Sequence, residues 1–382
     1  MNKCYICECT LVEGNNMSIE HIIPMALGGK LKSKFLLCIN CNSRFGADID
    51  SALVNQLSIM CNLLNIKREH KNVPNIIGHT TDGKEYVVKS DGIIQFGTRP
   101  DIMETNIDNK KKILIKARDK RAADKHLAGV LRKKGLCKNN VNITYEKNIQ
   151  YLKQPLEFKM PPLGGEKTYR AIAKIAVNYC MLFKDKYSLS KNNIDTNIFE
   201  YIINNKNNQW GFVYPYYFCK NDATKIYHIL SIHGDCSQKK LYAYVELLSI
   251  YKFVVVLNNN YLGRNFSEKY IFDVMNGEEI FINNQSFSAD FSLLRSDNLC
   301  DFTDEIKICM ENILNIVIRK NRIEFREKLI YEGINKALEK IKKLNINDKV
   351  EQSKIISEEV VELVAPHLIK GYSTSTQTKE GE

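Results

Sequence analysis

Apolar side chains recur every three or four residues in several stretches of the chain, which is the period of an α-helix. The first stretch covers residues 47–67 and includes Ile49, Leu53 and Leu57. The same spacing predicts further helices over 118–134, 166–183 and 301–367, the last with a polar break at 345–348. Gly135 directly follows the expected helix at 118–134, as glycine often does at a helix end.

Other stretches have the shorter period of β-strands or are continuously apolar. Asp91-Gly92 separates two such runs and predicts a hairpin over 86–96. Residues 112–115 predict one more strand, and five later strands are expected over 212–218, 226–232, 242–248, 253–257 and 270–274. Within 242–248, Tyr and Glu alternate with Ala, Val and Leu, which indicates a half-buried strand. Helices and strands in separate blocks predict the α+β fold class.

Composition narrows the kind of protein. The chain has 382 residues, of which 44% are hydrophobic and 26% charged, and its formal net charge is +11. Residues 110–134 alone hold eleven Lys or Arg against two Asp. Such a balance favours an anionic partner, of which nucleic acid is the commonest. No apolar run reaches the ~18 residues of a membrane span, and with no secretory segment at the start we expect a cytoplasmic protein.

Twelve cysteines in a reducing compartment favour metal binding over disulfides. Four of them form two matched pairs, Cys4-x2-Cys7 and Cys38-x2-Cys41. Four thiolates favour Zn²⁺ in a closed, structural site. Cys9 is the fallback ligand if the first pair is irregular.

Further residues surround these pairs in a recognisable order. Glu20-His21-Ile-Ile-Pro and Gly28-Gly29 lie between the pairs, and Asn42 directly follows the last cysteine. Over about residues 1–55 this arrangement resembles the HNH endonucleases with a ββα-metal fold, and their four-cysteine subgroup most closely. The resemblance implies that Glu20 and Asn42 hold one catalytic Mg²⁺ or Mn²⁺ and that His21 is the general base.

The implied residues suit phosphodiester hydrolysis. An imidazole, with an ordinary pKa of about 6.5, takes a proton from water at neutral pH, and a hard cation on carboxylate and amide oxygens stabilises charge on the phosphate. The sequence departs from the family at two positions. Glu20 stands where many members have Asp, and Ser33 stands where the family often has an Asn that orients the loop of the base.

Two basic groups are candidate phosphate contacts, and both have a second interpretation as solvated surface. The residues are Lys30, Lys32 and Lys34 after the glycine turn, and Lys120, Arg121, Arg132 and Lys133 on the expected basic helix. His228 and His233 match no common metal-ligand spacing, so we expect them to be structural.

These observations predict four parts: a zinc-stapled nuclease module at 1–75, an α+β domain for recognition, sensing or assembly at 76–300, a helical region at 301–371 and a disordered tail at 372–382. We expect an endonuclease that cuts duplex DNA, with a role in restriction or antiviral defence, and leave a homo-oligomer open. The alternatives are a non-catalytic zinc-knuckle protein that binds nucleic acid and an RNA-directed nuclease toxin.

Overall fold

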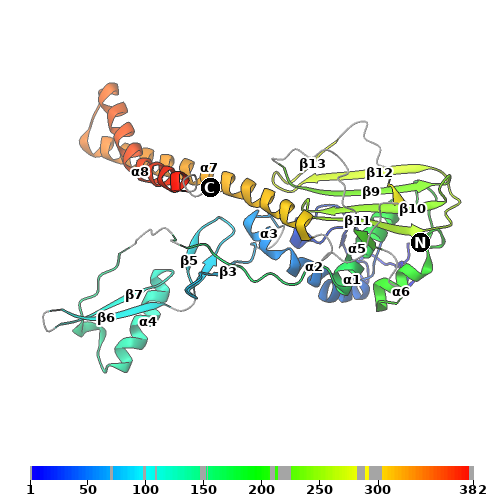
Figure 1. Ribbon diagram of the computed structural model, residues 1–382, viewed down its shortest axis with the longest axis horizontal. Coiled ribbons are helices and arrows are strands. Elements are labelled where there is room, and N and C mark those ends of the chain that lie inside the picture. The colour runs from blue at the N-terminus through cyan, green and yellow to red at the C-terminus, as the bar shows by residue number, and fades with distance from the viewer. Residues whose placement is uncertain are drawn as a thin grey trace. The chain divides into compact units, whose positions relative to one another are not determined.

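The computed structural model describes residues 2–68, 72–97, 100–107, 110–146, 152, 154–206, 211–213, 225–281, 289–291 and 303–377. By its internal contacts the chain divides into two compact units, Met1–Asn312 and Ile313–Glu382. Helices and sheets are mixed in the first unit and the second is helical, so the predicted α+β class is confirmed (Figure 1).

The first 66 residues are built around a short hairpin and a broken helical path. Strand β1 (Glu20–His21) pairs antiparallel with β2 (Lys32–Ser33), and the 3-10 turn η1 (Met25–Leu27) lies between them. The helical path then runs through α1 (Ile39–Phe45), the π-helical turn η2 (Gly46–Asp50), α2 (Ser51–Gln56) and α3 (Ser58–Leu63). The expected helix at 47–67 therefore begins earlier, at Ile39, and is interrupted at Leu57.

Two small sheets follow in the chain. Strands β3 (Ile76–His79), β4 (Glu85–Val88) and β5 (Ile94–Phe96) form one sheet, in which β4 and β5 confirm the predicted Asp-Gly hairpin. Strands β6 (Asp101–Ile107) and β7 (Lys110–Lys116) form a two-stranded ribbon, and helix α4 (Lys120–Lys133) packs on β7. Gly135 follows α4 with a positive φ of 65°, which confirms the predicted helix end. The turn η3 covers Lys138–Asn140.

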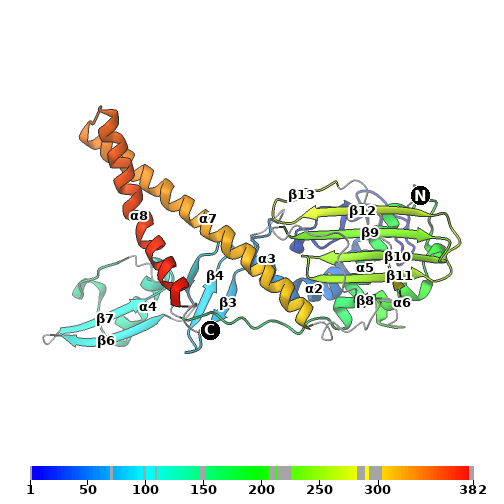
Figure 2. The same cartoon turned by 45° about the horizontal axis from the view of Figure 1, so that its top comes forward.

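A six-stranded antiparallel sheet is the largest element of the first unit (Figure 2). Its strand order is β13-β12-β9-β10-β11-β8. The bounds are β8 Gly211–Val213, β9 Tyr227–Asp235, β10 Lys240–Leu247, β11 Tyr251–Asn258, β12 Phe266–Asp273 and β13 Glu278–Glu279. All five predicted strands contribute to it, although residues 214–218 of the first lie outside the described residues.

Strand β10 was expected to be half-buried, and this prediction is wrong. Tyr242 and Tyr244, on one face, are 3% and 0% exposed, and Ala243 and Val245 on the other are fully buried. The tyrosines join a hydrophobic cluster with Ile229 and neighbouring residues. The polar residue of the alternation, Glu246, is also buried and accepts a hydrogen bond from the hydroxyl of Tyr244 at 2.5 Å.

Helix α5 (Glu166–Leu182) packs on β9, β10 and β11 and also on η2 and α2 of the N-terminal region. Its side chains from Ala171 to Cys180 are all buried, because α5 has a partner on more than one side. The turn η4 (Lys191–Asn193) and helix α6 (Thr196–Asn204) follow it. Helix α5 therefore connects the N-terminal region to the sheet.

The second unit contains most of a long helical hairpin. Helix α7 (Thr303–Leu344) begins in the first unit, and α8 (Lys349–Gln377) follows a break at Asn345, where φ is 53°. This confirms the predicted polar break. Helix α8 runs to Gln377, into the segment 372–382 that was expected to be disordered. Among the described residues, no helix combines the length and apolar character that a membrane span requires.

Candidate active site and metal centre

The two cysteine pairs converge at one point. The sulfur atoms of Cys4, Cys7, Cys38 and Cys41 all lie within 4.8 Å of one another. The first pair lies in a tight turn, closed by a hydrogen bond of 2.8 Å from the Glu8 amide to the Cys4 carbonyl. The second pair lies at the start of α1, where Cys38 precedes the first helical residue.

This cluster fits a zinc ion. Tetrahedral Zn²⁺ with Zn–S bonds of about 2.3 Å separates its sulfur ligands by about 3.8 Å, and the Cys7 and Cys38 sulfurs are 3.7 Å apart. Cys4 and Cys38 are buried, Cys41 is partly buried and Cys7 is exposed. Cys9 lies next to the cluster, with its sulfur 3.4 Å from that of Cys7, but the four matched cysteines form the group.

The candidate base, His21, lies on the hairpin β1–β2. It is half-buried and opposite Lys32 in the strand register. The turn between the strands depends on Gly28-Gly29: Gly28 has a φ of 90°, and a Cβ on Gly29 would lie 1.9 Å from the Ile23 carbonyl oxygen. Only glycine permits this approach, so the glycine pair shapes the hairpin that carries His21.

Asn42 ties the helix after the second cysteine pair to this hairpin. Its side-chain amide donates to the Ser18 hydroxyl at 3.2 Å and to the Ile19 carbonyl at 3.1 Å. Both acceptors lie just before Glu20-His21. The side-chain nitrogen is thereby turned toward the hairpin, which leaves the carbonyl oxygen as the atom that Asn42 can offer to a cation.

Glu20 lies in a buried charged cluster with residues distant in sequence. Its Oε1 is 2.7 Å from the ammonium of Lys174 and accepts a hydrogen bond of 2.8 Å from the Asn178 amide. The same ammonium is 2.6 Å from Asp50 Oδ2. The side chains of Glu20 and Lys174 are 3% and 1% exposed, so α5 contributes a cation to the interior of the N-terminal region.

The environment shifts the pKa of each partner. Burial disfavours the charged ammonium of Lys174, but the nearby carboxylates of Asp50 and Glu20 outweigh this and raise its pKa. Burial raises the pKa of the Glu20 carboxyl, against the opposing effect of Lys174. Burial and the charge of Glu20 also raise the pKa of Tyr5, whose hydroxyl donates to Asn178 at 2.6 Å.

The implied catalytic ion fits this site in donor chemistry. Hard divalent cations take carboxylate and amide oxygens, which Glu20 and Asn42 supply. Two carboxylates around one ammonium leave a net negative charge, and the buried Asp50 Oδ1 has no hydrogen-bond partner among the residues that the structure describes. Glu20 Oε1, however, is already bound by Lys174 and Asn178. A cation that reaches Glu20 therefore has to use its second oxygen or displace the ammonium.

The candidate phosphate contacts lie at two separate elements of the chain. Near the hairpin, Lys30 is half-buried, Lys32 is exposed and Lys34 forms an exposed ion pair of 3.1 Å with Glu13. On α4, the ammonium of Lys120 lies 4.8 Å from the ring centre of Tyr145. Arg132 and Lys133 lie in the last turn of that helix.

The cysteine cluster, the hairpin and the helix after it together occupy the segment that a family model covers. Residues 4–58 match the HNH endonuclease family. The comparisons with curated proteins and with solved structures found no match. We call residues 4–58 the HNH segment. The match confirms the resemblance seen in the sequence and covers only the N-terminal part of the chain.

Sequence reasoning missed three residues that contact the HNH segment or belong to it: Asp50, Lys174 and Asn178. Lys174 and Asn178 are four residues apart on α5, and Arg170 precedes them by four more. A helix that is otherwise apolar and carries polar residues at this spacing places them on one side. This spacing indicates that the three polar side chains face a common partner surface, but it does not tell which residues form that surface.

Proposed function

We propose that the HNH segment hydrolyses phosphodiester bonds in nucleic acid, with His21 as the general base. The observation that supports this most is the combination of a four-cysteine cluster with the hairpin that carries His21, joined by Asn42, within a segment that matches the family model. Duplex DNA as the substrate and a role in restriction or antiviral defence are finer parts of the same proposal.

The roles of the residues follow from their positions. His21 accepts a proton from the attacking water, which a neutral imidazole does at physiological pH. Asn42 positions the hairpin through the Ile19 carbonyl. Glu20 and Asn42 would hold the divalent ion, which supplies charge stabilisation at the phosphate when bound. The zinc cluster is structural and holds the two chain segments that flank the hairpin.

The decisive experiment compares His21→Ala with His79→Ala. The parent protein is incubated with duplex DNA, single-stranded DNA and RNA, with Mg²⁺ or Mn²⁺ and with a chelator. We expect His21→Ala to lower the cleavage rate by a factor of roughly 100 or more, since general-base catalysis contributes 10²–10⁴. His79→Ala changes a half-buried histidine on β3 and should cleave like the parent.

Zinc content and unfolding temperature of both variants show whether the fold is intact. Cleavage by His21→Ala at the parent rate would rule out His21 as the base. The competing function is a non-catalytic zinc-knuckle protein, which the ion pair between Glu20 and Lys174 favours. Nucleic-acid binding by the parent without cleavage under any metal condition would establish that function instead.

A further inference from the structure

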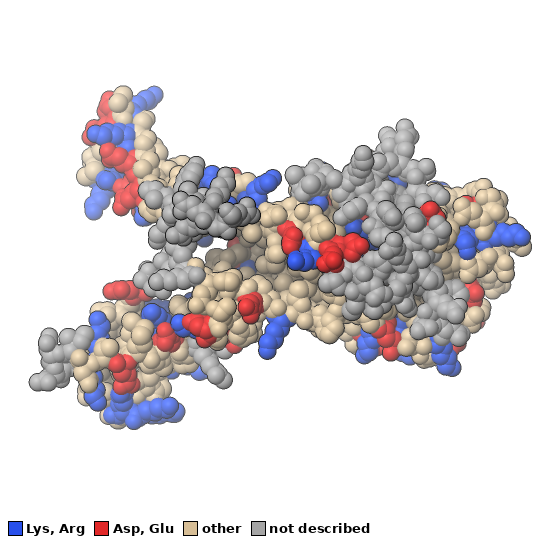
Figure 3. All heavy atoms as spheres, viewed as in Figure 1, with Lys and Arg blue, Asp and Glu red and all other residues tan. Residues whose placement is uncertain are grey.

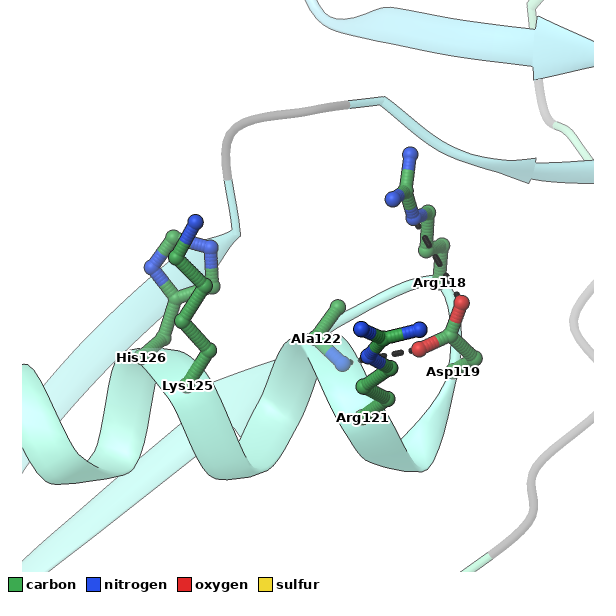
Figure 4. Close-up of a pocket in the computed structure, with 6 residues that line it drawn as sticks. All are labelled: Arg118, Asp119, Arg121, Ala122, Lys125 and His126. Carbon is green, nitrogen blue, oxygen red and sulfur yellow. Dashed lines mark hydrogen bonds and ion pairs between the residues drawn. The ribbon is translucent and has the colours of Figure 1, made fainter.

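A cavity of about 470 Å³ lies beside the start of α4, outside the HNH segment. Its lining includes four basic side chains, Arg118, Arg121, Lys125 and His126, together with Asp119 and Ala122. Figure 4 shows these side chains on the first two turns of the helix and on the two residues before it. In Figure 3, Lys and Arg are visible on the part of the surface that carries β6, β7 and α4.

Helix α4 is held by a side-chain cap at its start and by an ion pair near its end. Asp119 caps the helix by accepting a hydrogen bond of 2.7 Å from the Ala122 amide. Its Oδ2 also forms an ion pair of 3.4 Å with Nε of Arg118. At the other end, Lys134 forms an ion pair of 2.7 Å with Glu104 of β6. The cavity is therefore formed by side chains on a fixed helix, and the helix amide nearest to it is already occupied.

The charge of the cavity lining is positive and mostly uncompensated. Three permanent cations face one carboxylate, and that carboxylate serves as the helix cap. Within the part of the chain that the structure describes, Arg121 and Lys125 have no ion-pair partner. Both are exposed. Clustered cations repel one another, and an anion with several oxygens relieves this repulsion.

We propose that Arg118, Arg121, Lys125 and His126 form a phosphate-binding site for the backbone of a nucleic-acid strand. Arginine binds phosphate with two parallel hydrogen bonds, and lysine supplies a compact charge. Arg121 and Lys125 are four residues apart, about 6 Å along a helix, whereas the phosphates of one DNA strand follow at about 3.4 Å along the axis. The separation of these two side chains thus corresponds to about two phosphate steps along one strand.

This proposal rests on the proposed nuclease function and gives it an anchor outside the HNH segment. The HNH part has little charge of its own, since residues 1–50 hold five basic and five acidic side chains. Long-range attraction for a polyanion therefore has to come from elsewhere in the chain. The structure reduces the set of basic residues on α4 that we expect to contact phosphate. Of the four predicted from the sequence, Arg121 lines the cavity, whereas Lys120, Arg132 and Lys133 do not.

The test uses two triple variants of the full chain that remove the same charge from the same helix region. Arg118→Gln, Arg121→Gln and Lys125→Gln empty the cavity lining of permanent cations. Lys120→Gln, Arg132→Gln and Lys133→Gln are the matched control. Both sets are made in the His21→Ala background, and binding to a short labelled DNA duplex is measured over a range of salt concentrations without divalent ions.

We expect the cavity variant to bind roughly a hundredfold more weakly and to lower the slope of log affinity against log salt by about three, one for each lost phosphate contact. The control should lose less than about threefold, with a slope change below about one. Zinc content and thermal unfolding confirm that both variants fold. Equal losses in the two variants, or parent-like binding by the cavity variant, would overturn the proposal.

A nucleoside triphosphate and inorganic phosphate serve as competitors. If the cavity variant loses tight triphosphate binding but keeps the DNA affinity of the parent, the ligand of the site is a free nucleotide and the proposal is overturned. Failure of the nuclease proposal has a different signature, because it is read from cleavage by the parent protein. If the parent protein never cleaves nucleic acid, but DNA affinity is lost in the cavity variant and not in the control, the phosphate-binding site stands without the nuclease function.

Discussion

At the scale of single residues, the buried charged cluster is the least expected feature. Glu20 and Asp50 belong to the HNH segment, whereas Lys174 comes from α5 more than 120 residues later in the chain. Moving charges out of water costs free energy. The attraction between close partners offsets this cost only while both partners are present. The cluster therefore makes α5 part of the environment of the candidate active site.

Lys174→Met tests this dependence. The substitution keeps most of the side-chain volume but leaves the buried carboxylate of Glu20 and the 14% exposed carboxylate of Asp50 without their cation. Removing one partner of a buried pair costs about 3–5 kcal/mol, so we expect the free energy of unfolding to fall by that order. Urea unfolding followed by circular dichroism measures it.

Lys167→Met is the matched control for Lys174→Met. Lys167 lies on the same helix and forms an ion pair of 2.7 Å with Asp48, but its side chain is 57% exposed. Exposed pairs contribute about 0–1 kcal/mol. If both variants lose the same small amount of stability, the buried cluster has no special role in the fold.

At the scale of elements, the four-cysteine cluster lies among parts that have little regular structure. Strands β1 and β2 have two residues each, and the chain before β1 forms only isolated bridges. Such short elements cannot bury enough apolar surface to order themselves. Two cysteine pairs that converge at one point would supply the missing constraint when they hold a metal ion.

We expect Cys38→Ser to lose zinc and to lower the unfolding temperature, because binding of structural zinc is coupled to folding. Cys9→Ser is the control, since Cys9 lies beside the cluster and outside the group of four. It should retain zinc at the parent stoichiometry. Elemental analysis and thermal unfolding give both readouts. Purified parent protein without zinc would contradict the four-cysteine site.

At the scale of the whole first unit, His228 connects the large sheet to the HNH segment. Its Nδ1 accepts a hydrogen bond of 3.2 Å from the Leu248 amide, so its Nε2 carries the proton and donates to the Leu27 carbonyl at 2.8 Å. Burial lowers its pKa from 6.5 to about 4. His233, on the same strand, has a pKa of about 4 for the same reason. Both histidines are structural, as expected from their spacing.

These shifts predict a loss of stability in acid. Above about pH 6.5 both histidines are neutral in the folded and the unfolded chain, and their contribution is complete. Between about pH 6.5 and pH 4 the unfolded chain binds protons that the folded protein does not, so stability falls by up to about 1.4 kcal/mol per pH unit for each group.

His228→Gln removes one of these groups, because glutamine does not titrate and retains a donor for the Leu27 carbonyl. The free energy of unfolding, measured in urea from about pH 7 to about pH 4, should then depend on pH less steeply than in the parent, by up to about 1.4 kcal/mol per pH unit. Zinc release in acid affects both proteins alike and cancels in the comparison. Identical slopes would mean that His228 is not protonated on unfolding in this range.

The sequence by itself determined features that depend on neighbouring residues. The cysteine pairs, the Asp-Gly hairpin, helices α4 and α5 and the break after Leu344 all follow from spacing or turn chemistry within a few positions. The family of the HNH segment is confirmed for the same reason, because its motif is local. The catalytic roles of Glu20, His21 and Asn42 stay predictions.

Only the tertiary structure decided which distant surfaces meet. It placed Lys174 against Glu20 and buried both faces of β10. A repeating pattern tells which side of an element is apolar or charged, but the partner of that side is selected by packing of the whole chain. The buried lysine could thus be located on a helix from sequence, whereas its two carboxylates, 154 and 124 positions away, became known only when the chain was folded.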